Sequence, residues 1–135
     1  MPRALPHLDL HTLPVRAQVP VRFATWLLDR SRLGHAPSVK RIAGRLLKQP
    51  ARQGVIQAQS RLGQILCRDC GNTRDRRVGL ELLRQAARAG DGVAQLELGR
   101  LYCQPRHLEP QQARHWLELA ALQGVDEARD LLDRL

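Results

Sequence analysis

The sequence predicts an all-α fold built from helical hairpins in tandem, and three observations support this prediction. Hydrophobic residues make up 43% of the chain but aromatic residues only 3%, so the core must consist of Leu, Ala, Val and Ile. This composition suits closely packed helices better than a β-sandwich. Glycine and alanine motifs recur at spacings of 36 and 34 residues. The length of 135 residues is enough for one domain with a modest core.

The repeat is clearest at three glycines. Gly54 and Gly90 are 36 residues apart, and Gly124 follows 34 residues later. Further residues recur in the same register, namely Ala58, Ala94 and Ala128; Leu62-Gly63 and Leu98-Gly99; Ala86-Ala87 and Ala120-Ala121; Leu66 and Tyr102; and Leu82 and Trp116. Coincidence does not account for so many matches in one register.

The residue types at the recurring positions indicate paired helices. Alanine and glycine inside amphipathic stretches let two helix backbones approach closely, and leucines three or four residues away fill the space around that contact. The glycines at 54, 90 and 124 lie where one hairpin must turn into the next, and a left-handed C-terminal cap favours glycine there. Each unit is therefore predicted to be a helical hairpin joined to its neighbour by a tight turn.

Start signals place the individual helices. Ser38, Thr73 and Asp91 are predicted N-caps, and Pro110 fits the first turn of a helix. Helices are expected at 20–33, 38–49, 55–68, 74–89, 91–103, 110–123 and 125–134.

Two motifs resemble the Sel-one-like repeats, which are relatives of the tetratricopeptide repeat. They read Ala87-x-x-Gly90-x-x-x-Ala94-x-x-x-Leu98-Gly99-x-x-Tyr102 and Ala113-x-x-Trp116-x-x-x-Ala120-Ala121-x-x-Gly124. The preceding unit matches more loosely, because Gly79 is at the position equivalent to Ala113 and Leu82 is at the position equivalent to Trp116. In the leading unit, Pro50 falls where the pattern has a helical alanine.

This resemblance implies a short right-handed α/α superhelical solenoid of tetratricopeptide-like hairpins, about seven helices in all, that acts as an interaction adaptor. The expected division is an extended or disordered arm at 1–19 and a single repeat domain at 20–135. Within that domain we expect a degenerate unit at 20–50, repeats at 51–86 and 87–123, and a capping helix at 125–135. The arm is inferred from Pro2, Pro6 and Pro14, which occur without a helical period.

The predicted function is that of a non-catalytic adaptor or scaffold that binds a protein or peptide partner. The first helix of each hairpin is expected to line a concave surface. Its candidate contact residues lie away from the alanine and leucine packing positions, and they are Gln59, Arg61, Gln95 and Arg100.

Positive charge is concentrated near the N-terminus. Residues 1–54 carry ten basic and two acidic side chains, whereas residues 55–135 are nearly neutral. The candidate basic patch consists of Arg22, Arg30, Arg32, Lys40, Arg41, Arg45, Lys48 and Arg52. An alternative function is therefore a nucleic-acid-associated regulatory protein. No recognised nucleic-acid-binding motif accompanies the patch, so a solvated face or an acidic protein partner is favoured.

The cysteines offer a weaker hypothesis. Cys67 and Cys103 occupy equivalent repeat positions, so two neighbouring loops could bring Cys67, Cys70, Cys103 and His107 together as a zinc site. The favoured interpretation is that the two equivalent cysteines are small buried hydrophobes and that the chain uses no metal or cofactor. Redox catalysis by Cys67 and Cys70 is not expected, because a helix C-terminus opposes thiolate formation.

Other function classes receive no support from the sequence. There is no glycine-rich phosphate loop and no ordered Ser, His and Asp arrangement, so an enzyme is not expected. No window approaches the roughly 20 apolar residues of a membrane span, and the N-terminus does not resemble a signal peptide. Three cysteines suggest a reducing compartment. We therefore expect a cytoplasmic protein without membrane insertion, as a monomer or weak homodimer.

Overall fold

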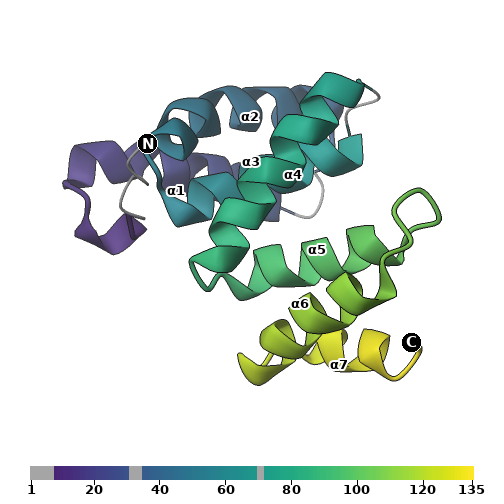
Figure 1. Ribbon diagram of the computed structural model, residues 1–135. Coiled ribbons are helices and arrows are strands. Elements are labelled where there is room, and N and C mark those ends of the chain that lie inside the picture. The colour runs from purple at the N-terminus through teal and green to yellow at the C-terminus, as the bar shows by residue number, and fades with distance from the viewer. Residues whose placement is uncertain (1–7, 31–34, 70–71) are drawn as a thin grey trace, which may run out of the picture.

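The computed structural model describes residues 8–30, 35–69 and 72–135, and within these ranges the regular structure is helical (Figure 1). The helices are η1 (Leu10–Thr12, a 3₁₀ turn), α1 (Val15–Asp29), α2 (Pro37–Arg52), α3 (Ile56–Asp69), α4 (Thr73–Arg88), α5 (Gly92–Cys103), α6 (Pro110–Leu122) and α7 (Asp126–Leu132). The predicted all-α class is confirmed, and the predicted bounds of α3 to α6 agree to within one residue at each end.

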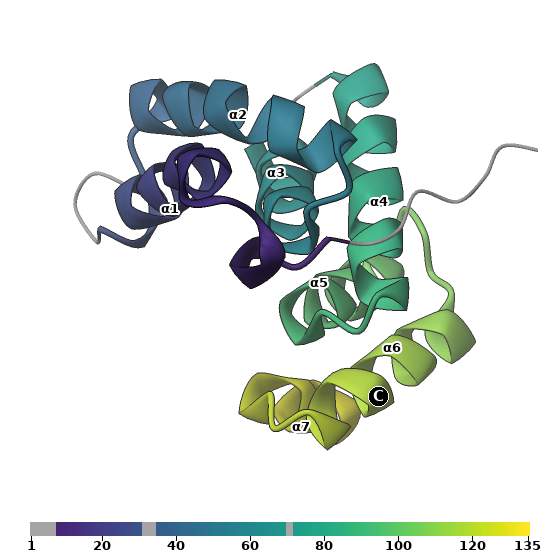
Figure 2. The same cartoon turned by 90° about the vertical axis from the view of Figure 1, so that its left-hand side faces the viewer.

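The helices form a curved row of hairpins. Each helix packs on the next one along the chain, and α1, α3, α5 and α7 also contact one another in turn. Figure 2 shows these four on the inner side of the curve, with α2, α4 and α6 on the outer side. The chain is thus a helical repeat solenoid, as predicted. We call α1, α3, α5 and α7 the A helices and their shared surface the A-helix face.

The repeating glycines make the predicted turns between hairpins. Gly54, Gly90 and Gly124 have φ angles of 89°, 99° and 85°. These angles lie in the left-handed region, which residues other than glycine rarely adopt. After Gly90, the backbone N–H of Asp91 donates to the carbonyl of Ala86 at 3.0 Å, and the equivalent bond forms after the other two glycines. This bond satisfies a carbonyl that the helix end leaves unpaired.

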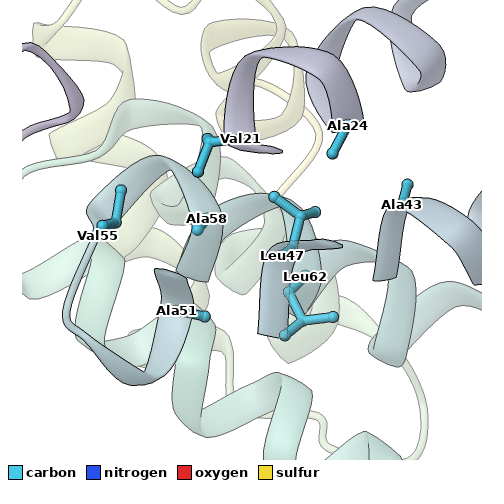
Figure 3. Close-up of a cluster of buried hydrophobic side chains, with 8 residues drawn as sticks. All are labelled: Val21, Ala24, Ala43, Leu47, Ala51, Val55, Ala58 and Leu62. Atoms are coloured by element: carbon cyan, nitrogen blue, oxygen red, sulfur yellow. The ribbon is translucent and has the colours of Figure 1, made fainter. Parts of the chain in front are cut away.

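Small residues hold the hairpins close together. The first core cluster joins α1, α2 and α3 (Figure 3) and consists of Val21, Ala24, Ala43, Leu47, Ala51, Val55, Ala58 and Leu62. The repeat alanines Ala58, Ala94 and Ala128 are fully buried, as their recurrence predicts.

Glycines inside the helices mark the closest helix crossings. A Cβ atom on Gly63 would lie 2.7 Å from the side chain of Leu83 and 2.9 Å from the carbonyl oxygen of Gly79. One on Gly99 would lie 2.5 Å from the side chain of Leu117. The Leu-Gly pairs of the repeat therefore exist because the A helix touches its hairpin partner at these points.

The first helix begins five residues earlier than expected, at Val15. Pro20 marks the predicted start, but it is an interior residue of α1. The helix starts after Pro14, whose carbonyl accepts the backbone N–H groups of Ala17 (2.9 Å) and Gln18 (3.3 Å). An interior proline removes one helical hydrogen bond and crowds the carbonyl four residues before it. The burial of Val21 and Ala24 in the core offsets this cost. Residues 15–19 are helical rather than extended.

The end of α2 and two of the predicted caps also differ from expectation. The helix continues through Pro50 to Arg52, because Pro50 and Ala51 are buried in its last turn. Ser38 is not an N-cap, since α2 begins at Pro37. Thr73 is the first residue of α4, and the preceding Asn72 caps the helix by accepting the backbone N–H of Arg74 at 2.9 Å. The N-cap predicted at Asp91 is confirmed. Pro110 lies in the first turn of α6, as predicted.

The described part of the N-terminal arm lies along the solenoid. Leu8 bridges to Val55, donating its N–H to the carbonyl of Gly54 at 2.9 Å and accepting the N–H of Ile56 at 3.1 Å. Leu8, Leu10 and Leu13 pack against the first core cluster. Residues 8–14 are therefore fixed across the turn between α2 and α3, while residues 1–7 lie outside the described part. None of the described helices has both the length and the apolar character needed to cross a bilayer.

Candidate protein-binding surface

Gln59 and Gln95 were expected to be exposed contact residues, and this expectation is wrong. Each side chain is only 3% exposed. The Nε2 atom of Gln59 donates to the carbonyl of Ala51 at 3.3 Å, and that of Gln95 donates to the carbonyl of Ala87 at 3.1 Å. Both carbonyls belong to the last turn of the preceding helix and also accept the backbone N–H of the turn glycine, Gly54 or Gly90. The two glutamines therefore fasten α3 and α5 to the hairpins before them.

The amide oxygens of these glutamines are satisfied differently. The Oε1 atom of Gln95 accepts from the Nε2 atom of Gln123 at 2.8 Å. In the repeat register, Ala89 stands where Gln123 stands in the next unit. The Oε1 atom of Gln59 is accordingly buried without a hydrogen-bond partner among the described residues.

The two arginines predicted as contacts do lie on the A-helix face, and both form ion pairs. Arg61 on α3 binds Asp29 on α1, with 2.6 Å between Nη2 and Oδ1. Arg100 on α5 binds Glu97 at 2.9 Å and also pairs with Glu127 on α7. These pairs tie neighbouring A helices together.

Glu97 is the centre of the larger network. It is 5% exposed and is held by Arg100 and by Arg68 on α3, whose Nε atom lies 3.1 Å from Oε2. A buried carboxylate requires such compensation, because its desolvation is unfavourable. Arg100 therefore has a structural role, and a charge reversal there would place a second carboxylate beside Glu97.

An open groove of about 740 Å³ lies on the A-helix face, and we call it the A-helix groove. It crosses α1, α3 and the start of α5, and it is lined by Leu10, Arg22, Thr25, Trp26, Asp29, Arg30, Gln57, Ser60, Arg61, Asp91 and Val93. It brings Arg61 together with Arg22 and Arg30, which the sequence placed in the basic patch. The groove thus combines three arginines with apolar side chains.

Trp26 is the most prominent side chain of the groove. It is 47% exposed, and its ring stacks on Phe23 with 5.8 Å between centroids and 18° between planes. The guanidinium of Arg30 lies 4.5 Å from the centre of the Trp26 ring, which is a cation–π contact. Two exposed aromatic rings are thereby held in fixed positions at the surface.

The aromatic pair continues an apolar strip along α1. Val15, Val19, Phe23 and Trp26 are all exposed and are spaced so that they share one side of the helix. The strip was not among the predicted features, because the helix was expected to begin at residue 20. The spacing itself is readable from the sequence once the helix begins at Val15.

The predicted basic patch is divided between two surfaces. Arg22 and Arg30 line the A-helix groove, whereas Lys40, Arg41, Arg45 and Lys48 line a second groove of about 500 Å³ between α2 and α3. Arg52 is exposed at the end of α2, and Arg32 lies outside the described residues. A single continuous basic stripe is therefore not formed by the described members.

The described cysteines give no support to the zinc hypothesis. Cys67 and His107 line one pocket of about 580 Å³ that Cys103 does not line, and both cysteines pack against the second core cluster. Cys70 lies outside the described residues. Within residues 8–30, 35–69 and 72–135, no group of three or more His, Cys, Asp or Glu side chains is arranged to hold a metal.

Tandem helical hairpins, joined by glycine turns and presenting an open A-helix face, define an α/α repeat protein. A family model of the Sel1 repeat matches residues 56–91 and 92–125, which is just over half of the chain. The chain belongs to the Sel1 repeat family, so the resemblance found in the sequence is confirmed. Searches of curated proteins and of solved structures found no match. Sel1 repeats generally mediate protein–protein interaction and are typically non-catalytic.

Proposed function

We propose that the chain is a non-catalytic adaptor that holds a partner protein in the A-helix groove. The observation that carries this proposal is the composition of the groove, in which the half-exposed Trp26 lies among Arg22, Arg30 and Arg61. Tryptophan and arginine are the residue types that most often dominate the binding energy of protein interfaces. The proposal is consistent with the general role of Sel1 repeats.

The geometry of the groove favours a peptide or helix as the bound element. The groove crosses parts of α1 and α3 and the start of α5, so an elongated segment would contact residues from each of them. The rings of Phe23 and Trp26 are already stacked, so little side-chain entropy is lost when a partner covers them. Arg61 and Asp29 form the polar rim and would orient the partner.

The residues proposed for binding differ from the four expected from the sequence. Arg61 remains a candidate because it lines the groove. Gln59 and Gln95 are not proposed again, because their side chains are buried. Arg100 lies on the same face but outside the groove, and its pairing with Glu97 and Glu127 gives it a structural role.

The test begins with a partner captured from lysate on the immobilised chain and identified after nuclease treatment. The affinity of the purified partner is then measured by titration calorimetry for wild type, Trp26→Ala and Leu122→Ala. Trp26→Ala should weaken binding about tenfold or more, as expected for an interface tryptophan. Leu122 is 83% exposed and is not among the residues that line the groove, so Leu122→Ala is the control and should bind as wild type.

The same experiment separates the two candidate functions. An affinity that Trp26→Ala leaves unchanged would rule out the A-helix groove as the binding surface. Binding that disappears after nuclease treatment would instead favour the nucleic-acid-associated alternative. The positively charged side chains of α2 are the feature that keeps this alternative open.

A further inference from the structure

A second groove, between α2 and α3, has a composition that the adaptor function of the A-helix face does not explain. We call it the α2 groove. Its volume is about 500 Å³, and its lining residues are His35, Pro37, Lys40, Arg41, Gly44, Arg45, Lys48, Leu62, Ile65 and Leu66. Four lysine and arginine side chains come from α2 and three aliphatic side chains come from α3, and none of the described lining residues is acidic. The groove therefore has a cationic rim above an apolar floor.

Gly44 at the centre of this groove is not required by helix packing. A Cβ atom there would lie 3.9 Å from Cδ1 of Leu62, which is ordinary contact. By contrast, a Cβ atom on Gly63, Gly79 or Gly99 would come within 3.0 Å of a neighbouring atom. Glycine in the interior of a helix is destabilising relative to alanine. The structural effect of Gly44 is to leave the α2 groove open beside Leu62.

The cations are arranged along the helix on either side of Gly44. Lys40 and Lys48 lie one turn before and one turn after Gly44, and Arg41 and Arg45 are one turn apart. Carboxylates at the same one-turn spacing on a partner helix would face them. Leucine-type side chains on that helix would meet Leu62, Ile65 and Leu66.

We propose that the α2 groove binds an acidic amphipathic helix of a partner protein. Charge complementarity carries the choice of occupant, because the described residues that line the groove are all basic or uncharged. Nucleic acid fits less well, because the lining residues that the structure describes include no Phe, Trp or Tyr to stack on bases and the floor is aliphatic. A second copy docked symmetrically, α2 against α2, fits less well, because residues 1–54 carry a net charge of +8 and would repel their counterpart.

The direct test uses a fluorescein-labelled peptide of about 18 residues, five helical turns, with leucines on one face and glutamates beside them. Binding to the full chain is measured by fluorescence anisotropy at two salt concentrations. The controls are a peptide of the same composition with a scrambled order and a single-stranded oligonucleotide. We expect the amphipathic peptide to bind more tightly than the scrambled one, and to bind more weakly at the higher salt concentration.

Variants of the chain locate the peptide. Arg41→Glu/Arg45→Glu should weaken binding about tenfold or more, because both side chains are exposed and line the groove. Gly44→Leu should also weaken peptide binding, because the leucine side chain fills the groove. The control variant Arg88→Glu/Arg114→Glu makes the same charge change on exposed residues of α4 and α6 and should have little effect on binding. Circular dichroism checks that each variant is folded, and sedimentation equilibrium measures self-association.

Several results would overturn the proposal. The scrambled peptide could bind as tightly as the amphipathic one, or the two charge-reversed variants could lose the same amount of affinity. The amphipathic peptide could also fail to bind the chain at all. Tighter binding of the oligonucleotide that is lost in Arg41→Glu/Arg45→Glu would assign the groove to nucleic acid. Self-association that Gly44→Leu abolishes would assign it to a second copy. Because the variants used for the A-helix groove leave α2 intact, the two proposals fail independently.

Discussion

A buried glutamine fastens each of two A helices to the hairpin before it. Gln59 and Gln95 each donate a side-chain N–H to a carbonyl in the last turn of the preceding helix. An unpaired amide in this position would destabilise the fold, whereas a paired one contributes roughly 0.5–1.5 kcal/mol. These two residues therefore stabilise the junctions between hairpins, and the register of the repeat depends on them.

The difference between the two junctions gives a prediction at the residue scale. Ala89→Gln places an amide where Gln123 stands in the next unit, within reach of the unpartnered Oε1 atom of Gln59. The free energy of unfolding should increase by about 0.5–1.5 kcal/mol, the usual contribution of one hydrogen bond. Urea denaturation followed by circular dichroism measures the change.

A double-mutant cycle provides the control for this prediction. In a Gln59→Leu background, Ala89→Gln has no amide oxygen to bind and should bring no gain. An equal gain in both backgrounds would show that the stabilisation comes from another source.

At the scale of the elements, glycines set how closely the paired helices approach. Gly63 and Gly79 face each other where α3 crosses α4, and Gly99 faces Leu117 where α5 crosses α6. Neither crossing leaves room for a Cβ atom, which would meet backbone and side-chain atoms at Gly63 and Gly79 and the Leu117 side chain at Gly99. The replacement of Ala113 by Gly79 in the earlier unit follows from the same crowding, because a Cβ atom at Gly79 would lie 2.8 Å from Cβ of Leu66.

Adding a methyl group at two helical glycines should therefore have opposite effects. Gly99→Ala should lower the free energy of unfolding by about 1–3 kcal/mol, because Leu117 must move. Gly44→Ala is the matched control, and it should be neutral or stabilising by about 0.5–1 kcal/mol, because its Cβ atom meets only ordinary contact. Thermal and urea denaturation of the two variants would reveal the contrast, and a similar effect of both would contradict the packing argument.

The sequence predicts helices from α3 onward well, because their glycine turns and alanine contacts depend on local residue types. It fails at α1, where Pro20 is a plausible first residue but the chain is already helical from Val15. It also fails at Gln59 and Gln95, whose polar side chains look exposed until the preceding helix end is in place. Burial of this kind depends on contacts between hairpins, which repeat spacing alone does not define.

For the whole molecule, the curved row of hairpins separates two kinds of surface. The A helices present the groove with Trp26 and three arginines, and the α2 groove presents cations over an apolar floor. The sequence revealed the excess of positive charge near the N-terminus but not its division between these surfaces. That division arises because Arg22 and Arg30 belong to the α1 side of the A-helix groove, whereas Lys40, Arg41, Arg45 and Lys48 lie along α2.

The most direct measurement of the central claim is site-specific photo-cross-linking in cells. A photoreactive phenylalanine analogue is placed at Thr25 in the A-helix groove, or at the exposed Arg88 on α4 as the control. The adaptor account predicts a discrete protein cross-linked from position 25 and not from position 88. A cross-linked protein obtained only from position 88, or none from position 25, would contradict the assignment of partner binding to the A-helix face.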